Sequence, residues 1–177
     1  MNRPWHITPR NSSSHVATLA RIALVLSLAL PGCIDNNDPS LLEVDRAELS
    51  LSSAPPGAET QFERVSLPDL WTRTRAETST SGWYRFQIAL DPVAETPQAL
   101  LLPWVIPGIE EIRANGTRQE NPEVEAGVAF APIDRSALRP GTNVIDIRFE
   151  TTLRMLGSVG PVYVGPRDLL ANAALRI

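Results

Sequence analysis

Residues 82–90 read Gly82-Trp83-Tyr84-Arg85-Phe86-Gln87-Ile88-Ala89-Leu90. Large apolar side chains stand at every second position, which is the repeat of a strand that buries one side and leaves the other polar. Asp91-Pro92 follows and ends the run, because proline cannot donate to a strand ladder. We therefore expect residues 82–90 to form one wall of a core whose other walls are strands further along the chain.

Several other segments carry strand or turn signals. Residues 143–150 alternate in the same way, and residues 109–114 alternate up to Asn115-Gly116, the pair best suited to a two-residue turn of type I′. Residues 98–106 are apolar at nearly every position, which predicts a strand covered on both sides. The fold class that these segments predict is all-β.

The remaining segments are assigned by weaker signals. We expect a first edge strand in Leu41–Leu51, an acidic loop at 121–126 and a single helical turn at 134–138 capped by Asp134. Residues 167–177 have the spacing of a short helix. The expected domain organisation is a segment 1–32, a linker 33–40, a β-sandwich over 41–166 and a carboxyl-terminal helix, or the start of a further segment, at 167–177.

The first 32 residues have the composition of an export signal. Arg3, Arg10 and Arg21 are the charged residues, no acidic residue occurs, and 22–30 is apolar apart from Ser27. A basic stretch, a short apolar stretch and small residues before a cleavage point form a secretory signal peptide. The apolar run is shorter than the ~20 residues of a membrane-spanning helix.

Leu30-Pro31-Gly32-Cys33 resembles the lipobox of bacterial lipoprotein precursors. The resemblance implies cleavage before Cys33 and attachment of acyl chains to its sulfur, which would anchor the protein to a membrane. The alternative is a buried helix or an uncleaved anchor with an incidental Cys. Ile34, where an Asp would favour the inner membrane in proteobacterial lipoproteins, points to the outer membrane. Residues 33–40 form a polar tether.

The composition after Cys33 excludes several classes of function. It contains 13 Arg, no Lys and 20 acidic residues, a formal charge of −7, whereas nucleic acid requires a basic surface. Both His lie before position 33, so no Ser-His-Asp or Cys-His arrangement and no zinc site of Cys and His can be built. We expect no catalytic residue, no metal site and no cofactor. A structural calcium ion on carboxylates is conceivable but not indicated.

Four motifs occur along the chain in this order: Trp71, then Gly82-Trp83-Tyr84-Arg85-Phe86, then Ile112-Arg113-Ala114-Asn115-Gly116, then Leu138-Arg139-Pro140-Gly141-Thr142-Asn143-Val144-Ile145. This series resembles the sugar-binding jelly-roll domain of family 2 glycoside hydrolases. It is also similar to the extracellular modules of some bacterial sensor histidine kinases and diguanylate cyclases. The resemblance covers about 62–166 and implies a jelly-roll β-sandwich of galactose-binding type. It carries over no catalytic residue.

Aromatic side chains raise the question of a sugar platform. Trp71, Arg73, Arg75 and Trp83 surround a polar loop and are the candidate ligand-binding residues. The alternative for both Trp is a place in the core. Arg85 and Arg148 lie on strand faces that are otherwise polar, where cross-strand pairing with carboxylates such as Asp146 is the ordinary interpretation.

The sequence thus predicts a non-catalytic envelope lipoprotein whose jelly roll binds a carbohydrate or a protein partner. One alternative is the periplasmic input domain, or a fragment, of a histidine kinase or diguanylate cyclase receptor. Another is a glycosidase that uses carboxylates alone, such as Glu110-Glu111 or the acidic residues of 120–125.

Overall fold

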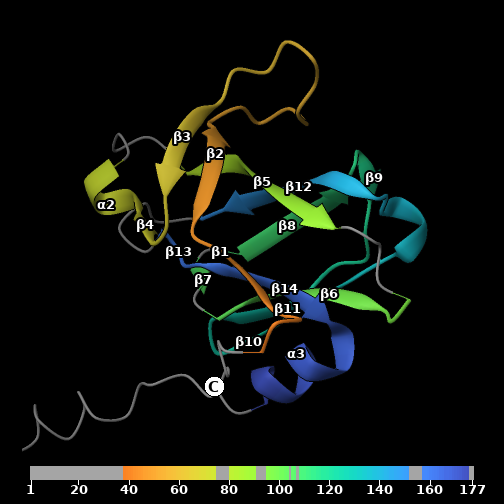
Figure 1. The fold of residues 1–177 in the computed structure, drawn as a ribbon. Helices are drawn as coiled ribbons and strands as arrows, with labels where there is room; N and C mark the ends of the chain where they lie inside the picture. The colour runs from red at the N-terminus through yellow and green to blue at the C-terminus, as the bar shows by residue number, and fades with distance from the viewer. Residues whose placement is uncertain are drawn as a thin grey trace, which may run out of the picture. The chain divides into compact units, whose positions relative to one another are not determined.

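The computed structural model describes residues 38–74, 80–90, 95–103, 105–106, 108–151 and 157–175. Their strands form three antiparallel sheets (Figure 1). The elements are β1 (Leu42–Val44), β2 (Arg46–Ser50), β3 (Glu63–Ser66), β4 (Asp69–Leu70), α2 (Trp71–Thr74), β5 (Ser81–Leu90), β6 (Gln98–Leu102), β7 (Val105–Ile106), β8 (Gly108–Ala114), β9 (Thr117–Arg118), β10 (Glu123–Glu125), β11 (Val128–Ile133), η1 (Arg135–Ala137), β12 (Gly141–Glu150), β13 (Ser158–Val159), β14 (Val162–Pro166) and α3 (Arg167–Ala174).

The larger sheet has the strand order β3-β2-β5-β12-β8-β9. Its centre is the ten-residue pairing of β5 with β12, the two segments whose alternation is clearest in the sequence. Their apolar sides face a second sheet of order β1-β14-β6-β11-β10, and one core cluster contains buried side chains of both sheets. The expected β-sandwich is therefore confirmed, with residues 82–90 as one wall of its core.

The second sheet is covered on both sides. All five residues of β6 are buried, as the continuous apolar run predicts. On its outer side lies α3 (Figure 1), whose Leu170 and Ala173 are buried against Leu101 and Phe130 of the sheet. The expected helix thus exists and packs on the sandwich. No helix within the described residues is long and apolar enough to cross a membrane.

The prediction of one edge strand in Leu41–Leu51 is wrong. β1 pairs with β14 at the edge of the five-stranded sheet, whereas β2 lies between β3 and β5 in the six-stranded sheet. Leu42, Val44, Ala47 and Leu49 alternate loosely, but Asp45 lies between two strands that pair in different sheets. Ala47 and Leu49 are buried, whereas Val44 is half-buried and Leu42 is exposed. The chain therefore crosses from one layer to the other here.

The expected loop at 121–126 also contains a strand. β10 pairs with β11 at the end of the five-stranded sheet, and its three residues are exposed. Charged residues suit an unpaired sheet edge, which is why the composition resembles a loop. The helical turn at 134–138 is confirmed as η1, and Asp134 accepts a hydrogen bond from the Ser136 backbone N–H at 2.8 Å.

Two turn motifs lie side by side and are tied by one network. Asn115 and Gly116 have φ of 49° and 85°, as a type I′ turn requires. The Asn115 side-chain amide donates to Asn143 Oδ1 at 2.8 Å, and Asn115 Oδ1 accepts from the Val144 N–H at 3.0 Å. Asn143, which is fully buried, donates in turn to the carbonyls of Arg139 and Gly141. The two motifs, which are far apart in the sequence, thus complete each other's hydrogen bonds.

Candidate functional site

Trp71 lies in the core. Its side chain is fully buried, and its indole N–H donates to the Tyr84 hydroxyl at 2.6 Å. Tyr84 donates to Asp69 Oδ2 at 2.5 Å, and Thr74 donates to Asp69 Oδ1 at 2.6 Å. The chain of hydrogen bonds satisfies a buried carboxylate and a buried indole N–H. No face of the Trp71 ring is open to a sugar. Of the two roles expected for this residue, the structure shows the place in the core.

Trp83 is also fully buried, but on the other side of β5. It stands opposite Arg148 in the strand register, and the guanidinium of Arg113 lies 5.7 Å from its ring centroid. Its indole N–H has no hydrogen-bond partner among the residues that the structure describes. Trp83 therefore supports the polar face of the six-stranded sheet from below its charged side chains and offers no open ring face for stacking.

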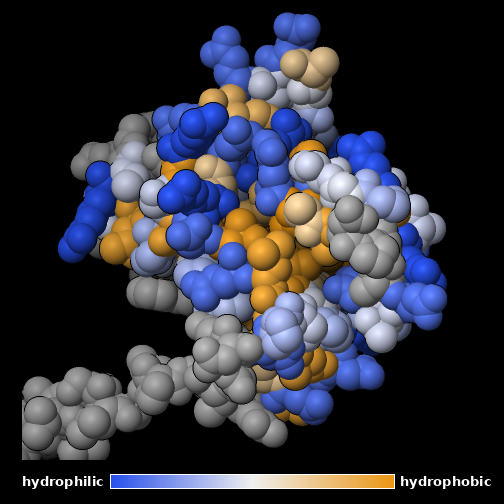
Figure 2. Space-filling model, in the orientation of Figure 1, coloured by the Kyte–Doolittle hydropathy of each residue, from blue (hydrophilic) through white to orange (hydrophobic). Residues whose placement is uncertain are grey.

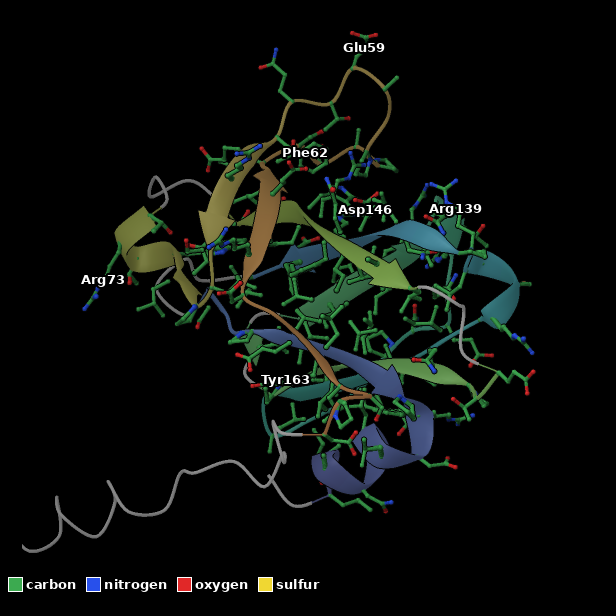
Figure 3. The ribbon with its side chains drawn as sticks, viewed as in Figure 1. Glu59, Phe62, Arg73, Arg139, Asp146 and Tyr163 are labelled. Carbon is green, nitrogen blue, oxygen red and sulfur yellow. The ribbon has the colours of Figure 1, made fainter. Side chains whose placement is uncertain are left out.

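The other residues predicted as site or anchor do not join these two. Arg73 is exposed on α2 and points away from the sheets (Figure 3). Arg75 and Cys33 lie outside the described residues, as do residues 1–32. The structure thus does not bring Trp71, Trp83 and Arg73 together at one surface.

A row of charged side chains instead crosses the outer face of the six-stranded sheet. The strand registers align one residue from each strand. From β3 to β9 these residues are Arg64, Glu48, Arg85, Asp146, Arg113 and Arg118. Opposite charges face each other along most of the row, an arrangement that stabilises cross-strand pairs.

Arg85 is the most firmly held member of this row. Its Nε and Nη2 donate to the two oxygens of Asp146 at 2.7 and 3.1 Å, and its guanidinium lies 4.2 Å from the centroid of the Phe62 ring. Phe62 and Asp146 lie over the same side of the sheet (Figure 3). The hydrogen bonds to Asp146 raise the pKa of Arg85 above its usual range, so the group is a permanent cation. The sequence-based pairing of Arg85 with Asp146 is confirmed, whereas Arg148 bonds Glu150 of its own strand at 3.1 Å.

Beside Arg85 the outer face is hollowed into a groove of about 510 Å³. Its lining residues come from β2, β3 and β5 and from the end of β1: Val44, Arg46, Ala47, Glu48, Arg64, Val65, Ser66, Arg85 and Gln87. Hydrophilic residues cover β2 and β3 in the view of Figure 2. A second hollow of about 560 Å³ lies along the loop between β2 and β3 and is lined by Ser50, Ser52, Pro55, Gly57, Ala58, Glu59, Thr60 and Gln61.

Arg85 also has unused donors in the groove. A guanidinium carries five N–H groups, and the two bonds to Asp146 use two of them. The other three have no hydrogen-bond partner among the described residues. The guanidinium is held in place while three of its N–H groups remain available. It is therefore suited to bind an external acceptor, because little side-chain freedom is lost on binding.

The carboxylates of the described residues do not form a metal cluster, and Glu110 and Glu111 do not face each other. No group of three or more His, Cys, Asp or Glu side chains converges within the part of the chain that the structure describes. Glu110 is exposed, and the carboxylate of Glu111 accepts a hydrogen bond from Arg113 Nε at 2.6 Å. Adjacent strand residues point to opposite faces, so these two carboxylates do not face each other.

The groove was not among the sequence-predicted sites. Glu48 and Arg85 are 37 positions apart in the sequence, and each segment by itself resembles an ordinary solvent face. The available signal was Arg85 on a strand face that is otherwise polar, for which cross-strand pairing was the ordinary interpretation.

Comparison with known proteins identifies similar structures but no similar sequence. No protein-family model and no curated protein sequence matches the chain. A glycosyl hydrolase family 2 member from Bacteroides cellulosilyticus matches 71% of this chain at 16% identity with a TM-score of 0.54. A β-glucuronidase from Ruminococcus gnavus matches 70% of it at 10% identity with a TM-score of 0.53.

The match covers only part of those enzymes. This chain spans 20% of the length of the first and 29% of the length of the second. At this identity the likeness concerns the fold. The described residues therefore have the fold of a jelly-roll β-sandwich of the kind found within family 2 glycoside hydrolases, as the order of the sequence motifs predicts.

Proposed function

We propose that this protein is a non-catalytic carbohydrate-binding module, and that the groove over β2, β3 and β5 is its site. The observation that supports the site is the state of Arg85, which is clamped by Asp146 and Phe62 yet retains three unused donors. The fold supports the ligand class, because the similar structures are parts of enzymes that act on glycosides.

The groove has the chemistry of a sugar-binding surface. Guanidinium, amide and carboxylate groups form directed hydrogen bonds, and Arg85, Gln87 and Glu48 place one of each kind along its wall. Small-ligand sites in proteins combine a concave shape with a few such fixed polar groups. Val44 and Val65, which are half-buried, add the apolar part of the lining, which suits the ring carbons of a pyranose.

Binding without turnover follows from the acid content of the groove. Hydrolysis of a glycosidic bond uses two carboxyl groups about 5 to 9.5 Å apart on either side of the bond. Glu48 is the one carboxylate among the described residues that line the groove. A lining with one carboxylate supports recognition of a glycan over its hydrolysis.

The proposed place of the module is the bacterial envelope. Cleavage before Cys33 and acylation of its sulfur would hold the sandwich at a membrane surface through the polar tether of residues 33–40. The module then faces the periplasm, and the absence of Asp after Cys33 favours the outer membrane. A carbohydrate or a protein of the envelope is the expected partner.

A glycan array with the full chain tests the proposed function. Binding to at least one glycan without release of new reducing ends is the expected result. Gln87→Ala should weaken that binding about threefold to tenfold, the effect of one hydrogen bond, with an unchanged melting temperature because Gln87 is exposed.

Thr142→Ala is the matched control for that variant. Thr142 is also exposed on the six-stranded sheet but does not line the groove, so its affinity should equal that of the unmodified chain. Turnover of a bound glycan, or equal losses in the two variants, would contradict the proposal.

A further inference from the structure

We infer that the groove takes a glycan that carries carboxylate groups, with Arg64 and Arg46 as the anion contacts beside the fixed guanidinium of Arg85. The inference rests on the proposed carbohydrate-binding function and adds the charge of the ligand. Its basis is the juxtaposition of three arginines from three strands along one groove.

The charge of the groove is opposite to that of the domain. The chain after Cys33 has a formal charge of −7. The groove is lined by three arginines and one acidic residue, Glu48, which lies between Arg64 and Arg85 in the register. Asp146 balances Arg85 from outside the lining. Two cations therefore remain against one carboxylate, in a hollow that concentrates their field.

The strength of their ion pairs distinguishes Arg64 and Arg46 from three other arginines on the same face. Arg85, Arg113 and Arg148 each bond a carboxylate at 2.6 to 3.1 Å. Arg64 is exposed on β3 and makes no such bond among the described residues. Arg46 approaches Asp45 only to 4.0 Å, with 86% of its side chain exposed, a contact of little energy. Of the three arginines at the groove, Arg64 and Arg46 are thus the two that the fold leaves without a firm partner among the described residues.

A carboxylated sugar suits this arrangement better than a neutral one. Guanidinium and carboxylate form two parallel charge-assisted hydrogen bonds, which are stronger than bonds between neutral groups. The hydroxyls of the same sugar would still find Gln87 and Glu48. A neutral glycan would engage Arg85 and Gln87 but would gain nothing ionic from Arg64 or Arg46.

The test uses pairs of oligosaccharides that differ only in charge. The full chain is titrated by calorimetry with tetramers of galacturonic acid, mannuronic acid and hyaluronan, each beside its methyl ester. At least one free acid should bind about tenfold or more tightly than its ester, as expected for a charge-assisted bond. The difference should shrink as salt rises from 20 to 500 mM, because the Debye length falls from roughly 20 Å to about 4 Å and exposed charges are screened.

Arg64→Gln and Arg46→Gln locate the effect. Each should reduce affinity for the free acid about fivefold to tenfold and leave the ester within about twofold. Arg118→Gln is the control, since Arg118 is exposed on the same sheet but lies at its far edge, on β9. Circular dichroism melting of all three variants verifies that they fold.

The outcomes separate the two proposals. If acids and esters bind equally, or if Arg118→Gln weakens acid binding as much as Arg64→Gln, the inference fails and carbohydrate binding stands. If none of these oligosaccharides binds and the glycan array is also empty, the proposed function fails and the inference falls with it.

Discussion

Trp71 shows how one side chain joins separate parts of the domain. Its backbone N–H donates to the carbonyl of Gly157 at 2.9 Å, and its indole N–H reaches Tyr84 on β5. The ring packs so closely on Gly157 that a methyl group there would lie 2.7 to 2.8 Å from three ring carbons. The absence of a side chain at position 157 is therefore what permits the ring to be buried.

Gly157→Ala should destabilise the protein by about 1–3 kcal/mol, the usual cost of overpacking a filled core. Trp71 is fully buried and has no open space to move into. Gly57→Ala is the control, because a methyl group there meets nothing within 4 Å, and its effect should be near zero or slightly stabilising. Urea unfolding of both variants measures the difference, and equal midpoints would refute this account of the Trp71 contact.

Asp134 provides a pH-dependent contribution at the residue scale. The hydrogen bond from the Ser136 backbone N–H holds the pKa of its carboxyl below the ordinary value of 3.8. Because the folded pKa is the lower one, the carboxylate stabilises the fold above that ordinary value, and the contribution is lost as the pH falls through the folded pKa.

Asp134→Ala should therefore lower the melting temperature at pH 7, and the gap to the unmodified chain should close in strong acid. Asp134→Asn retains an oxygen acceptor at the cap but cannot ionise, so its gap to Asp134→Ala should not vary with pH. Thermal melts followed by circular dichroism supply both comparisons. A gap for Asp134→Ala that is the same in acid and at neutral pH would show that ionisation of this carboxyl plays no part.

At the scale of elements, the turns of the six-stranded sheet hold its edge in register. The type I′ turn between β8 and β9 presents Asn115 to the start of β12, where Asn143 is buried. Neither amide could be satisfied if the hairpin slipped by one residue, since every side chain would then face the other side. The network is thus a register lock that spans 28 residues of chain.

Asn143→Ala should cost about 2–4 kcal/mol, because it leaves several buried hydrogen-bonding groups unsatisfied. Asn172→Ala, at an exposed position of α3, should change stability by no more than about 0.5 kcal/mol. Denaturant unfolding measures both.

A double-mutant cycle then tests whether the two turns act together. Asn115→Gly removes the side chain but preserves the left-handed backbone, so strain does not confuse the result. The double variant should cost less than the sum of the single variants, with a coupling of about 0.5–3 kcal/mol. Strictly additive costs would show that Asn115 and Asn143 do not stabilise the fold together.

At the scale of the whole molecule, the two outer faces of the sandwich differ. The outer face of the five-stranded sheet is apolar and is covered by α3. The outer face of the six-stranded sheet carries the row of charges and the groove. One face therefore contributes to stability through burial of apolar area, and the other is available for recognition.

The proposed membrane attachment also concerns the whole molecule, and it can be tested at Cys33. Cys33 is the only Cys of the chain, so Cys33→Ser removes every site for thioether-linked acylation. Cells that express the unmodified protein should incorporate a fatty-acid analogue into it, and the variant should remain unlabelled and leave the membrane fraction. Ser40→Ala, a change at the end of the tether, should label normally. Equal labelling of the Cys33 variant would exclude the proposed anchor.

Several features of this fold follow from local sequence. The alternation in residues 82–90 and 143–150 predicts two strands, and the structure pairs them over ten residues. Asn115-Gly116, the cap at Asp134 and the apolar run of β6 are correct for the same reason, since turns, caps and double-sided burial leave marks within a few residues. The order of the motifs was sufficient to predict the jelly roll.

What only the tertiary structure decided depends on contacts between distant segments. The crossing at Asp45 depends on the strands with which each half of 41–51 pairs, which are β14 for β1 and β5 for β2. The burial of Trp71 and Trp83 depends on partners at Gly157, Tyr84 and Arg148, none of which their own neighbourhoods reveal. The groove arises only where β2, β3 and β5 become neighbours. Local pattern determines which residues form strands, whereas the free energy of packing those strands determines which side chains share a surface.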